Sequence, residues 1–546
     1  MSEGSGENLS LSQSPRAVSK DVLNTFINSP DTSEALHTFL QHTTPKELVL
    51  QIAALAASDV KEEERKTKKE LGEGEEDENL QLLVKALQKC FTCDAEILPS
   101  LIKDPQLHQI LVKAADSPSA LLRRLLSQQL SRLVLKGQEG FAVVHESGFY
   151  SLFLHLLNDP DVGVSSDASK ALLSSLDSPE GVKAFFDPDF WGRIYTGTSL
   201  QTDSVLRIRV LSLLVEAGRK KESVFKEIQS RGGYENLMKT FLSADEDILL
   251  KITAISLVEQ LGSYPLGLGF LAEKDIPTKL VSELQDPMLD ETSRVSLVHV
   301  LADLAKHHQG EQSSEIAQRL LSIKNENSEG QSSKKSILLL DVLRDFLHEV
   351  PTSPQEKTEV TCAIGAWGSL AGSSVSSYQL IEECYPEILE EVTRSFSGET
   401  EIANLAMDSW KYVIERMPSP LPSPVEETLK KSVIKQALKT HLDRPFGESR
   451  AHSYPLLEAL SKSRFAVQTF LSSDPLRRSL IDPFSDDSSD AKYAKHAFVK
   501  KILTDYSDLC SAVIDDGYLA HLRRFADGGP FYMPPGAGTS VESTWA

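Results

Sequence analysis

The sequence has few cysteines, few aromatic residues and no long apolar run. Five cysteines occur among 546 residues, and aromatic residues make up 7%. A small, odd number of cysteines is typical of proteins kept in a reducing compartment. No run reaches the roughly 18 apolar residues of a membrane span, and residues 1–16 are rich in Ser and Gly and lack the apolar segment of a secretory signal. We therefore expect a cytoplasmic location, with the nucleus as a second compartment.

The sequence also has no excess of positively charged residues. The chain has 57 basic and 79 acidic residues, which gives a formal charge of −22. This balance argues against binding nucleic acid or an anionic membrane over a large surface, whereas it would suit a partner with a basic patch. Residues 61–78 are almost entirely charged. We interpret them as a solvated acidic loop or a frayed helix end, with a docking site for a basic partner as the alternative.

Alternation of apolar and polar residues, the signature of strands, is absent over any useful length. Residues 233–261 instead predict two helices around a short acidic turn. The second helix, 248–261, is apolar around most of its circumference, so neighbouring helices must cover it on several sides. Residues 148–176 repeat the pattern, and 191–217 lie halfway between the two copies. The repeat is therefore about 43 residues long, within the range of armadillo and HEAT repeats.

Repeats of this kind stack so that each one contacts only its neighbours. We predict an all-α, armadillo/HEAT-like helical-repeat solenoid over residues 19–527. A disordered tail over 1–18 and an irregular tail over 528–546 flank it. Within the solenoid we expect a polar loop over 309–335, which holds one short helical stretch over 316–323, and a proline-rich turn over 418–424.

No group of residues has the spacing of a catalytic, cofactor or metal site. Cys90 and Cys93 form a C-x-x-C pair, but no second pair or nearby His pair completes a zinc site, so we interpret both as structural. The glycines within 365–372 do not have the spacing of a nucleophile elbow, and we interpret them as points where two helices approach closely. Gly267 and Gly269 are interpreted as a turn between helices. We therefore predict a protein that is not an enzyme and holds no metal or cofactor.

A polar stripe recurs on the second helix of five successive repeats, at positions i, i+3 and i+7. Corresponding members lie about 43 residues apart, so we expect them to align in the stack. Second helices usually line the inner surface of such stacks, where extended partners bind. We predict that the stripe binds a protein partner, and simple solvent exposure stays open as the alternative. Its residues are Arg124, Ser127, Ser131, Asp167, Lys170, Ser174, Arg209, Ser212, Glu216, Thr253, Ser256, Gln260, Ser296, His299 and Asp303.

Three stretches resemble the proteasome non-ATPase regulatory subunit 5 family. Residues 490–503 are similar to that family's late helix, and 518–532, with Gly529-Pro530-Phe531-Tyr532, are similar to its closing helix and aromatic tail. Residues 232–273 resemble its central repeat. The acidic insert and the long polar break depart from the family pattern.

The resemblance implies a non-catalytic chaperone for assembly of the 26S proteasome regulatory-particle base. Such proteins bind the C-terminal domain of a base ATPase subunit in an assembly intermediate and leave before the holoenzyme is complete. We also expect a monomer when free and, from the acidic charge, no nucleic-acid or membrane partner. A general armadillo-repeat scaffold for another assembly stays open, because a fold does not fix a function. A nuclear-import adaptor would place Asn four residues after successive Trp residues, and Trp191, Trp367 and Trp410 lack it.

Overall fold

The computed structural model is helical wherever it describes the chain. It describes residues 17–66, 78–195, 203–242, 247–286, 288–306, 311–324, 336–347, 351–444 and 447–533. Within these ranges the only pairing of extended backbone is an isolated bridge between Lys324 and Ile337. Most of both predicted tails and of the predicted acidic loop lies outside the described residues.

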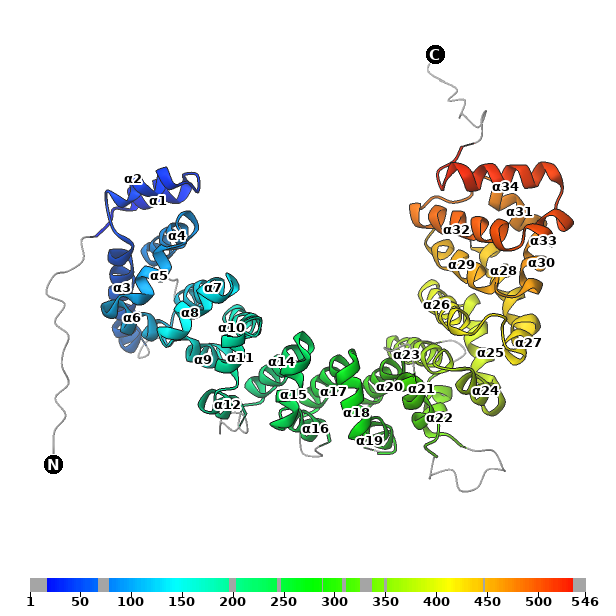
Figure 1. The fold of residues 1–546 in the computed structure, drawn as a ribbon, viewed down its shortest axis with the longest axis horizontal. Coiled ribbons are helices and arrows are strands. Elements are labelled where there is room, and N and C mark those ends of the chain that lie inside the picture. Colours follow the sequence, from blue (N-terminus) through cyan, green and yellow to red (C-terminus); the bar gives the residue numbers. More distant parts are fainter. Residues whose placement is uncertain are drawn as a thin grey trace, which may run out of the picture. The chain divides into compact units, whose positions relative to one another are not determined.

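The chain divides into two compact units, which we call unit 1 (Met1–Lys239) and unit 2 (Thr240–Ala546). Each unit is a stack of helices (Figure 1). The helices that begin in unit 1 are α1 (Lys20–Asn28), α2 (Ser33–Leu40), α3 (Pro45–Lys66), α4 (Glu78–Cys93), α5 (Ile97–Lys103), α6 (Pro105–Ala114), α7 (Ala120–Leu135), α8 (Gln138–Glu146), η1 (Phe149–Ser151), α9 (Leu152–Leu157), α10 (Val162–Ser175), α11 (Pro179–Phe185), α12 (Pro188–Tyr195), α14 (Ser204–Lys220), α15 (Glu222–Ser230) and α16 (Glu235–Leu242). The helices of unit 2 are α17 (Ile248–Gly262), α18 (Pro265–Glu273), α19 (Ile276–Glu283), α20 (Glu291–Lys306), α21 (Glu311–Leu320), α22 (Leu338–Phe346), α23 (Pro354–Ala371), α24 (Val375–Cys384), α25 (Pro386–Arg394), η3 (Ser395–Ser397), α26 (Thr400–Arg416), α27 (Ser423–Thr428), η4 (Leu429–Val433), α28 (Ile434–Asp443), α29 (Gly447–Leu460), α30 (Arg464–Ser472), α31 (Asp474–Ile481), α32 (Ser489–Asp505), α33 (Ser507–Val513) and α34 (Asp516–Gly528).

A typical repeat contains three helices rather than the two expected from the sequence. Two short helices precede a long one, as α8 and α9 precede α10 and as α18 and α19 precede α20. The break between the short helices falls at a residue in the left-handed backbone region, Gly148 (φ 77°) in the first case and Asp275 (φ 55°) in the second. A residue in this conformation ends a helix and redirects the chain. Three helices per unit is the armadillo form of the repeat.

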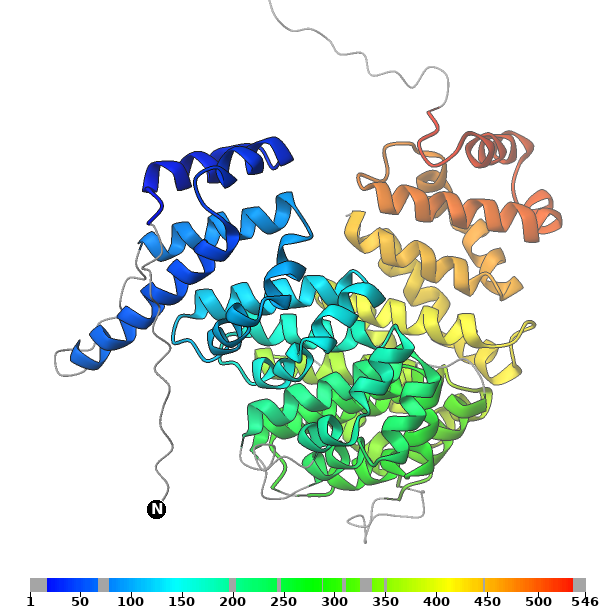
Figure 2. The same ribbon diagram turned by 60° about the vertical axis from the view of Figure 1, so that its left-hand side comes forward.

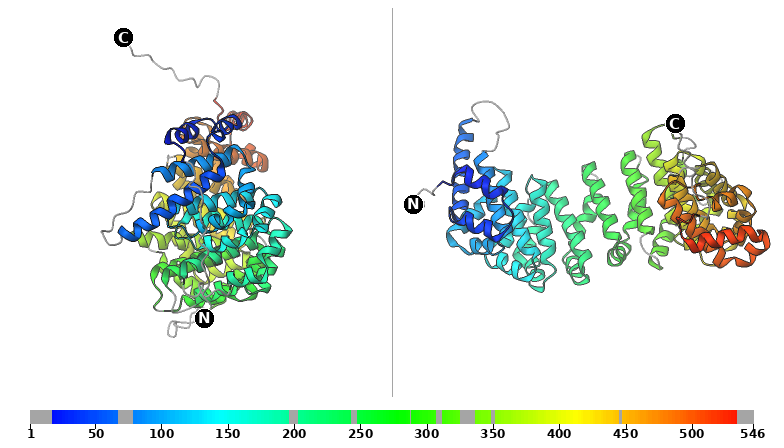
Figure 3. Two further views of the ribbon diagram at one scale, coloured as in Figure 1. Left: turned by 90° about the vertical axis from the view of Figure 1, so that its left-hand side faces the viewer. Right: turned by 90° about the horizontal axis from the view of Figure 1, so that it is seen from above.

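The long helices form one layer of each unit and the short helices form the other. In unit 1 the long helices α4, α7, α10 and α14 contact one another in succession. In unit 2 the same is true of α17, α20, α23, α26, α29 and α32. Figure 2 and Figure 3 show the same side-by-side stacking within each unit from other sides. Because it packs against α18 and α20, α17 buries residues on several sides: Leu250, Ala254, Ile255, Leu257, Val258 and Leu261.

An aspartate at the N-terminus of four long helices fixes where each helix begins. The residues are Asp161, Asp203, Asp247 and Asp290, about 43 residues apart. In α10, for example, Asp161 Oδ1 accepts a hydrogen bond from the backbone N–H of Gly163 at 2.8 Å. Such a cap satisfies backbone donors that have no partner within the helix. The repeated aspartate therefore keeps the register of the stack constant.

Guanidinium groups connect successive repeats in unit 1. Arg123 in α7 forms an ion pair with Asp159, in the turn before α10, through Nε and Oδ2 at 2.6 Å. Arg209 in α14 donates from Nη1 to the carbonyl oxygens of Leu157 at 2.9 Å and Asp159 at 2.7 Å. Both side chains of the Arg123–Asp159 pair are largely buried. The turn around Asp159 thus joins three successive long helices.

Unit 2 packs two tryptophans where helices α23 and α26 cross. The rings of Trp367 and Trp410 are fully buried, with centroids 4.8 Å apart. Beside them, a Cβ atom at Gly368 would lie 2.9 Å from Ser409 Cβ, whereas one at Gly365 would meet nothing within 4 Å. The interpretation of this glycine-rich stretch as a close helix contact is therefore confirmed at Gly368.

A charged network lies inside the C-terminal part of unit 2. Asp486 Oδ1 is 3.0 Å from Arg450 Nη1, and its Oδ2 is 3.2 Å from Lys495 Nζ. All three side chains are less than a tenth exposed. Burial by itself raises the pKa of Asp486, but Lys495 and Arg450 outweigh it and hold that pKa below its usual value. Nearby, burial and the charge on Arg450 lower the pKa of His441 to about 3, so its imidazole is neutral.

Helices extend into two of the predicted loops. Helix α3 continues to Lys66, so residues 61–66 form the end of a helix, which is one of the two interpretations of the acidic stretch. Helix α21 lies within the predicted polar loop 309–335 and begins earlier than the helical stretch predicted over 316–323. Gly267 lies inside α18 rather than in a turn, and a Cβ atom there would lie 1.8 Å from the Leu261 carbonyl oxygen. Glycine is thus needed for close approach of backbones, which a sequence pattern does not distinguish from a turn.

Candidate functional site

The predicted stripe lies on the long helices, but its α7 portion is mostly buried. Arg124 is exposed and forms an ion pair with Asp161, with Nε and Oδ2 2.7 Å apart. Ser127 and Ser131 are 0% and 3% exposed, so the prediction that they line a binding surface is wrong. Serine is small enough to be buried between helices, and Ser127 Oγ donates to the Arg124 carbonyl oxygen in its own helix.

Helices α10 and α14 present more of the predicted stripe. Lys170 and Glu216 are exposed, while Asp167, Ser174 and Ser212 are partly buried. Burial raises the pKa of Asp167, and Lys170 opposes that effect. The exposed charges on this part of unit 1 are therefore available to a partner.

Arg209, also in the predicted stripe, holds the repeats together. It is partly buried, and its Nη1 donates to two backbone carbonyl oxygens of the turn before α10. Leu157 is the last residue of α9 and Asp159 lies just past it, where carbonyl groups have no partner within the helix. Arg209 is thus a structural residue, and a change at this position would disturb the stack as well as any surface.

The stripe in unit 2 lies on α17 and α20. Ser256 and Gln260 are exposed, and Thr253 and Ser296 are partly buried. Thr253 Oγ1 donates to the Leu249 carbonyl oxygen at 2.7 Å, as Ser296 Oγ does to its own helix. These two hydroxyl groups are therefore already hydrogen-bonded within their own helices. The two remaining stripe residues lie on α20.

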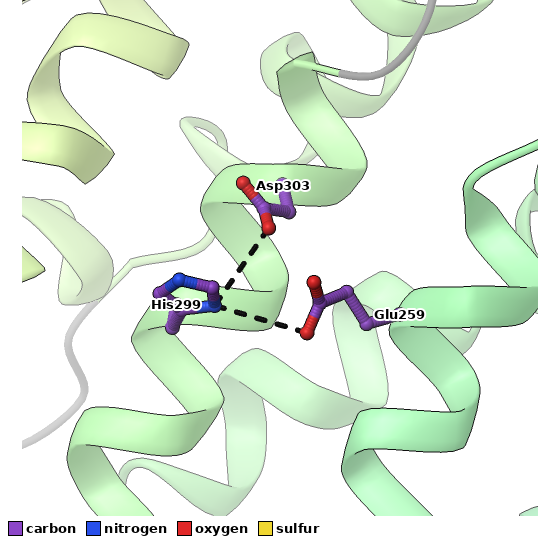
Figure 4. A group of neighbouring side chains, drawn as sticks. All are labelled: Glu259, His299 and Asp303. Atoms are coloured by element: carbon purple, nitrogen blue, oxygen red, sulfur yellow. Dashed lines mark ion pairs between the residues drawn. The ribbon is translucent and has the colours of Figure 1, made fainter.

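Those residues, His299 and Asp303, form a cluster with Glu259 of α17 (Figure 4). His299 Nδ1 lies 3.8 Å from Glu259 Oε2 and 3.7 Å from Asp303 Oδ2. Figure 4 shows the three side chains converging, with both ion pairs made by the imidazole and with Glu259 approaching from the neighbouring helix. The imidazole is 59% exposed, whereas the carboxylates are 28% and 18% exposed.

The two carboxylates of this cluster influence each other. Burial raises the pKa of Glu259, and a hydrogen bond with Asp303 and the negative charge of Asp303 raise it further. Two carboxylates held this close repel each other when both are ionised, so the pair favours a proton or a cation between them. Among the described residues, this is the one group of three His, Cys, Asp or Glu side chains whose ligand atoms all lie within 4.8 Å of one another.

Sequence reasoning predicted His299 and Asp303 as surface residues but did not include Glu259. The spacing of four residues between His299 and Asp303 was visible, because it places both on one face of a helix. Glu259 lies 40 positions earlier than His299 in the chain, which is close to one repeat. A search for acidic residues at repeat spacing from the His–Asp pair would have found it.

The C-x-x-C pair has the structural character predicted for it. Cys90 lies in α4, fully buried, and burial raises the pKa of its thiol to about 12. Cys93 is the last residue of α4 and is partly exposed, and both thiols are free. A thiol with a raised pKa is a poor nucleophile and a poor metal ligand near neutral pH.

Each unit also has a hollow that the sequence did not predict. In unit 1 a cavity of about 360 Å³ lies between α3, α4, α5, α6 and α7 and is almost wholly apolar. The buried Gln129 lines it, and its Nε2 has no hydrogen-bond partner among the described residues. In unit 2 a polar groove of about 850 Å³ runs along α25 and α28, with the exposed Lys431, Lys435 and Lys439 on its wall.

Comparison with known proteins decides the family. Residues 33–312 and 426–545 match the model of the family described as proteasome non-ATPase 26S subunit. The chain belongs to this family. The matched ranges cover most of the chain, including α17 and α20, so the resemblance inferred from the sequence is confirmed. A search among curated proteins gave no match.

Solved structures support the armadillo/HEAT-like fold. Kap95p in complex with RanGDP has a TM-score of 0.53 and 13% identity, and the match covers 92% of this chain and 63% of Kap95p. The chain is also similar to an engineered protein, with a TM-score of 0.45 and 16% identity, over 77% of this chain and 95% of that protein. For β-catenin, from a study of cadherin binding, the TM-score is 0.39 and the identity 14%, over 82% of this chain and 84% of that chain. The match to Kap95p and the described helices confirm the predicted all-α helical-repeat fold. No helix among the described residues is long and apolar enough to span a membrane.

Proposed function

We propose that this family member is a non-catalytic chaperone for assembly of the 26S proteasome regulatory-particle base. It binds the C-terminal domain of a base ATPase subunit, holds it in a base assembly intermediate, and leaves before the holoenzyme is complete. Family membership supports a proteasome partner. The free protein is a monomer in the cytoplasm and nucleus and binds neither nucleic acid nor membrane.

The observation that carries the proposal is the layer of long helices, with exposed charges on successive repeats. In unit 1, Lys170 of α10 and Glu216 of α14 are both exposed. A stable protein interface buries about 1,200–2,000 Å² in total, which several consecutive repeats can supply. Charged residues at the edge of such an interface set partner choice and association rate more than affinity.

Release of the partner requires a difference in binding between two of its states. A chaperone that leaves a finished assembly must bind the ATPase domain more weakly, or not at all, once its neighbours are in place. Overlap between the chaperone surface and a later neighbour would give this difference without any catalytic step. The proposal therefore needs no active site.

The first test is affinity capture of the full-length protein from native lysate, followed by mass spectrometry. Co-purification of base ATPase subunits without subunits of the proteolytic core is the expected result. Capture of the intact holoenzyme, or of no proteasome subunit, would contradict the proposal. Capture of a different assembly would favour the alternative, a general armadillo-repeat scaffold.

A charge swap tests the surface. We expect Lys170→Glu combined with Glu216→Lys to weaken capture of the ATPase domain, because both charges lie exposed on long helices while the net charge is unchanged. The matched control is Glu180→Lys with Lys183→Glu, which makes the same exchange on the exposed surface of the short helix α11. Equal capture by both variants would remove the α10–α14 surface from the interface. Circular dichroism and melting temperature should be those of the unmodified protein in each case.

A further inference from the structure

The cluster of Glu259, His299 and Asp303 in unit 2 has the composition of a metal site. Its ligand atoms come from two adjacent long helices, Glu259 from α17 and the other two from α20 (Figure 4). His299 and Asp303 are four residues apart, and this spacing places both side chains on the same face of the helix. Packing of α17 against α20 therefore brings three donor groups together without any loop.

The distances are close to those that a small cation imposes. Zinc binds imidazole nitrogen and carboxylate oxygen at about 2.0–2.2 Å, so two ligand atoms of a tetrahedral site lie about 3.4 Å apart. His299 Nδ1 lies 3.7 Å and 3.8 Å from the nearest carboxylate oxygens. All three ligand atoms lie within 4.8 Å of one another, so rotation of the side chains is needed to bring them to zinc-binding distance.

The donor set selects the kind of cation. Calcium and magnesium prefer sites made of oxygen atoms only, whereas an imidazole nitrogen favours zinc and its first-row neighbours. Three protein ligands leave a fourth tetrahedral position open, as in zinc sites that also bind water or an external ligand. Because the imidazole is 59% exposed, that position has access to solvent.

We propose that Glu259, His299 and Asp303 form a binding site for a divalent transition metal of the Zn²⁺ class. His299 binds through Nδ1, and each carboxylate supplies one oxygen atom. The bound ion neutralises the two neighbouring carboxylates and links α17 to α20. The inference does not depend on the proposed chaperone function.

The experiment uses full-length protein freed of metal with a chelator and then titrated with Zn²⁺ by calorimetry. The measurement is made in a Cys93→Ser background, which removes the partly exposed thiol of the C-x-x-C pair as a competing zinc ligand. We expect His299→Ala to lose one equivalent of Zn²⁺ per chain. Glu259→Gln, which preserves size but removes a charged ligand, should weaken that equivalent by at least about 10-fold, since even supporting residues of metal sites contribute this much.

The matched control is His452→Ala. His452 also pairs with an aspartate in unit 2, with Nδ1 2.9 Å from Asp408 Oδ2, but it is not part of a three-ligand group among the described residues. This variant should bind as much Zn²⁺ as its parent. Loss of the same equivalent in His452→Ala, or unchanged binding in both His299→Ala and Glu259→Gln, would overturn the assignment.

Two further readouts separate a specific site from surface binding. Co²⁺ in the site should give the visible absorption of a tetrahedral ion bound by nitrogen and oxygen, and this absorption should be absent in His299→Ala. Zn²⁺ should also raise the melting temperature of the parent but not of His299→Ala, because the metal binds the folded state alone. Excess Mg²⁺ or Ca²⁺ should not displace the ion, and displacement by either would contradict the assignment to the Zn²⁺ class.

Discussion

The two units use charge differently to hold a similar stack of helices together. In unit 1 the guanidinium groups of Arg123 and Arg209 connect neighbouring repeats at the turn around Asp159. In the C-terminal part of unit 2 the charges of Arg450 and Asp486 lie inside the stack, with Lys495 beside them. Arg209 binds backbone carbonyl groups near a helix end, which lack partners within the helix. The buried cations of unit 2 also donate to backbone carbonyl oxygens, but they depend in addition on one shared carboxylate, that of Asp486. The same architecture therefore has two different weak points.

The largest expected effect is in unit 2. Asp486→Ala removes the anion that Arg450 and Lys495 share, and leaves two buried cations, so we expect a loss of about 3–5 kcal/mol. Hydrogen exchange measured by mass spectrometry should show faster exchange in α29 and α32 and unchanged exchange in α7 and α10. The control is Asp508→Ala, which breaks an exposed pair with Arg464 and should change little. Equal effects of the two substitutions would mean that the internal network does not hold unit 2 together.

Unit 1 should respond most to loss of a turn connection. Arg123→Ala leaves the carboxylate of Asp159 buried without its partner, and we expect a loss of about 3 kcal/mol. The neighbouring Arg124→Ala removes an exposed guanidinium and should cost clearly less. Urea unfolding followed by tryptophan fluorescence, with hydrogen exchange to locate the change, measures both. A larger loss of stability in Arg124→Ala than in Arg123→Ala would contradict the distinction between buried and exposed ion pairs.

Acid should destabilise unit 2 through His441. The folded-state pKa of about 3 lies below the ordinary value of 6.5, so between these values the unfolded state binds a proton that the folded state does not. The contribution of His441 to the free energy of unfolding is therefore fully present above pH 6.5 and falls by about 1.4 kcal/mol per pH unit below it. His441→Gln removes the group that takes up this proton on unfolding. The free energy of unfolding should therefore fall less steeply with pH, measured from urea unfolding at pH 7 to pH 5. An unchanged slope would show that other groups cause the acid sensitivity.

The smallest effect concerns the contact between α23 and α26. Gly368→Ala places a methyl group 2.9 Å from Ser409 Cβ, and we expect it to cost about 1–3 kcal/mol through overpacking. Gly365→Ala, three residues away, meets no atom within 4 Å and should stabilise the helix by about 0.5–1 kcal/mol. Melting temperatures of the two variants give the comparison. A destabilising Gly365→Ala would show that helix propensity is not what differs between these sites.

The sequence alone predicted much of the fold. The repeat of about 43 residues and the apolar circumference of 248–261 predicted a stack of helices, because a helix that is apolar on several sides needs neighbours on those sides. The small residues around Gly368 predicted a close helix contact, because only a residue without a side chain allows it. These properties depend on local chemistry that is repeated along the chain, and one sequence is enough to reveal them.

Only the tertiary structure decided which polar residues form a surface. Ser131 and Glu216 occupy equivalent places in the sequence pattern, yet the first is buried between helices and the second is exposed. Arg209 fits a polar stripe equally well, but the turn that approaches it from the preceding repeat makes it structural. Glu259 and His299 come together because α17 and α20 pack in one particular register. Contacts of this kind depend on the distance and rotation between helices, and the periodicity of a single helix does not determine either of them.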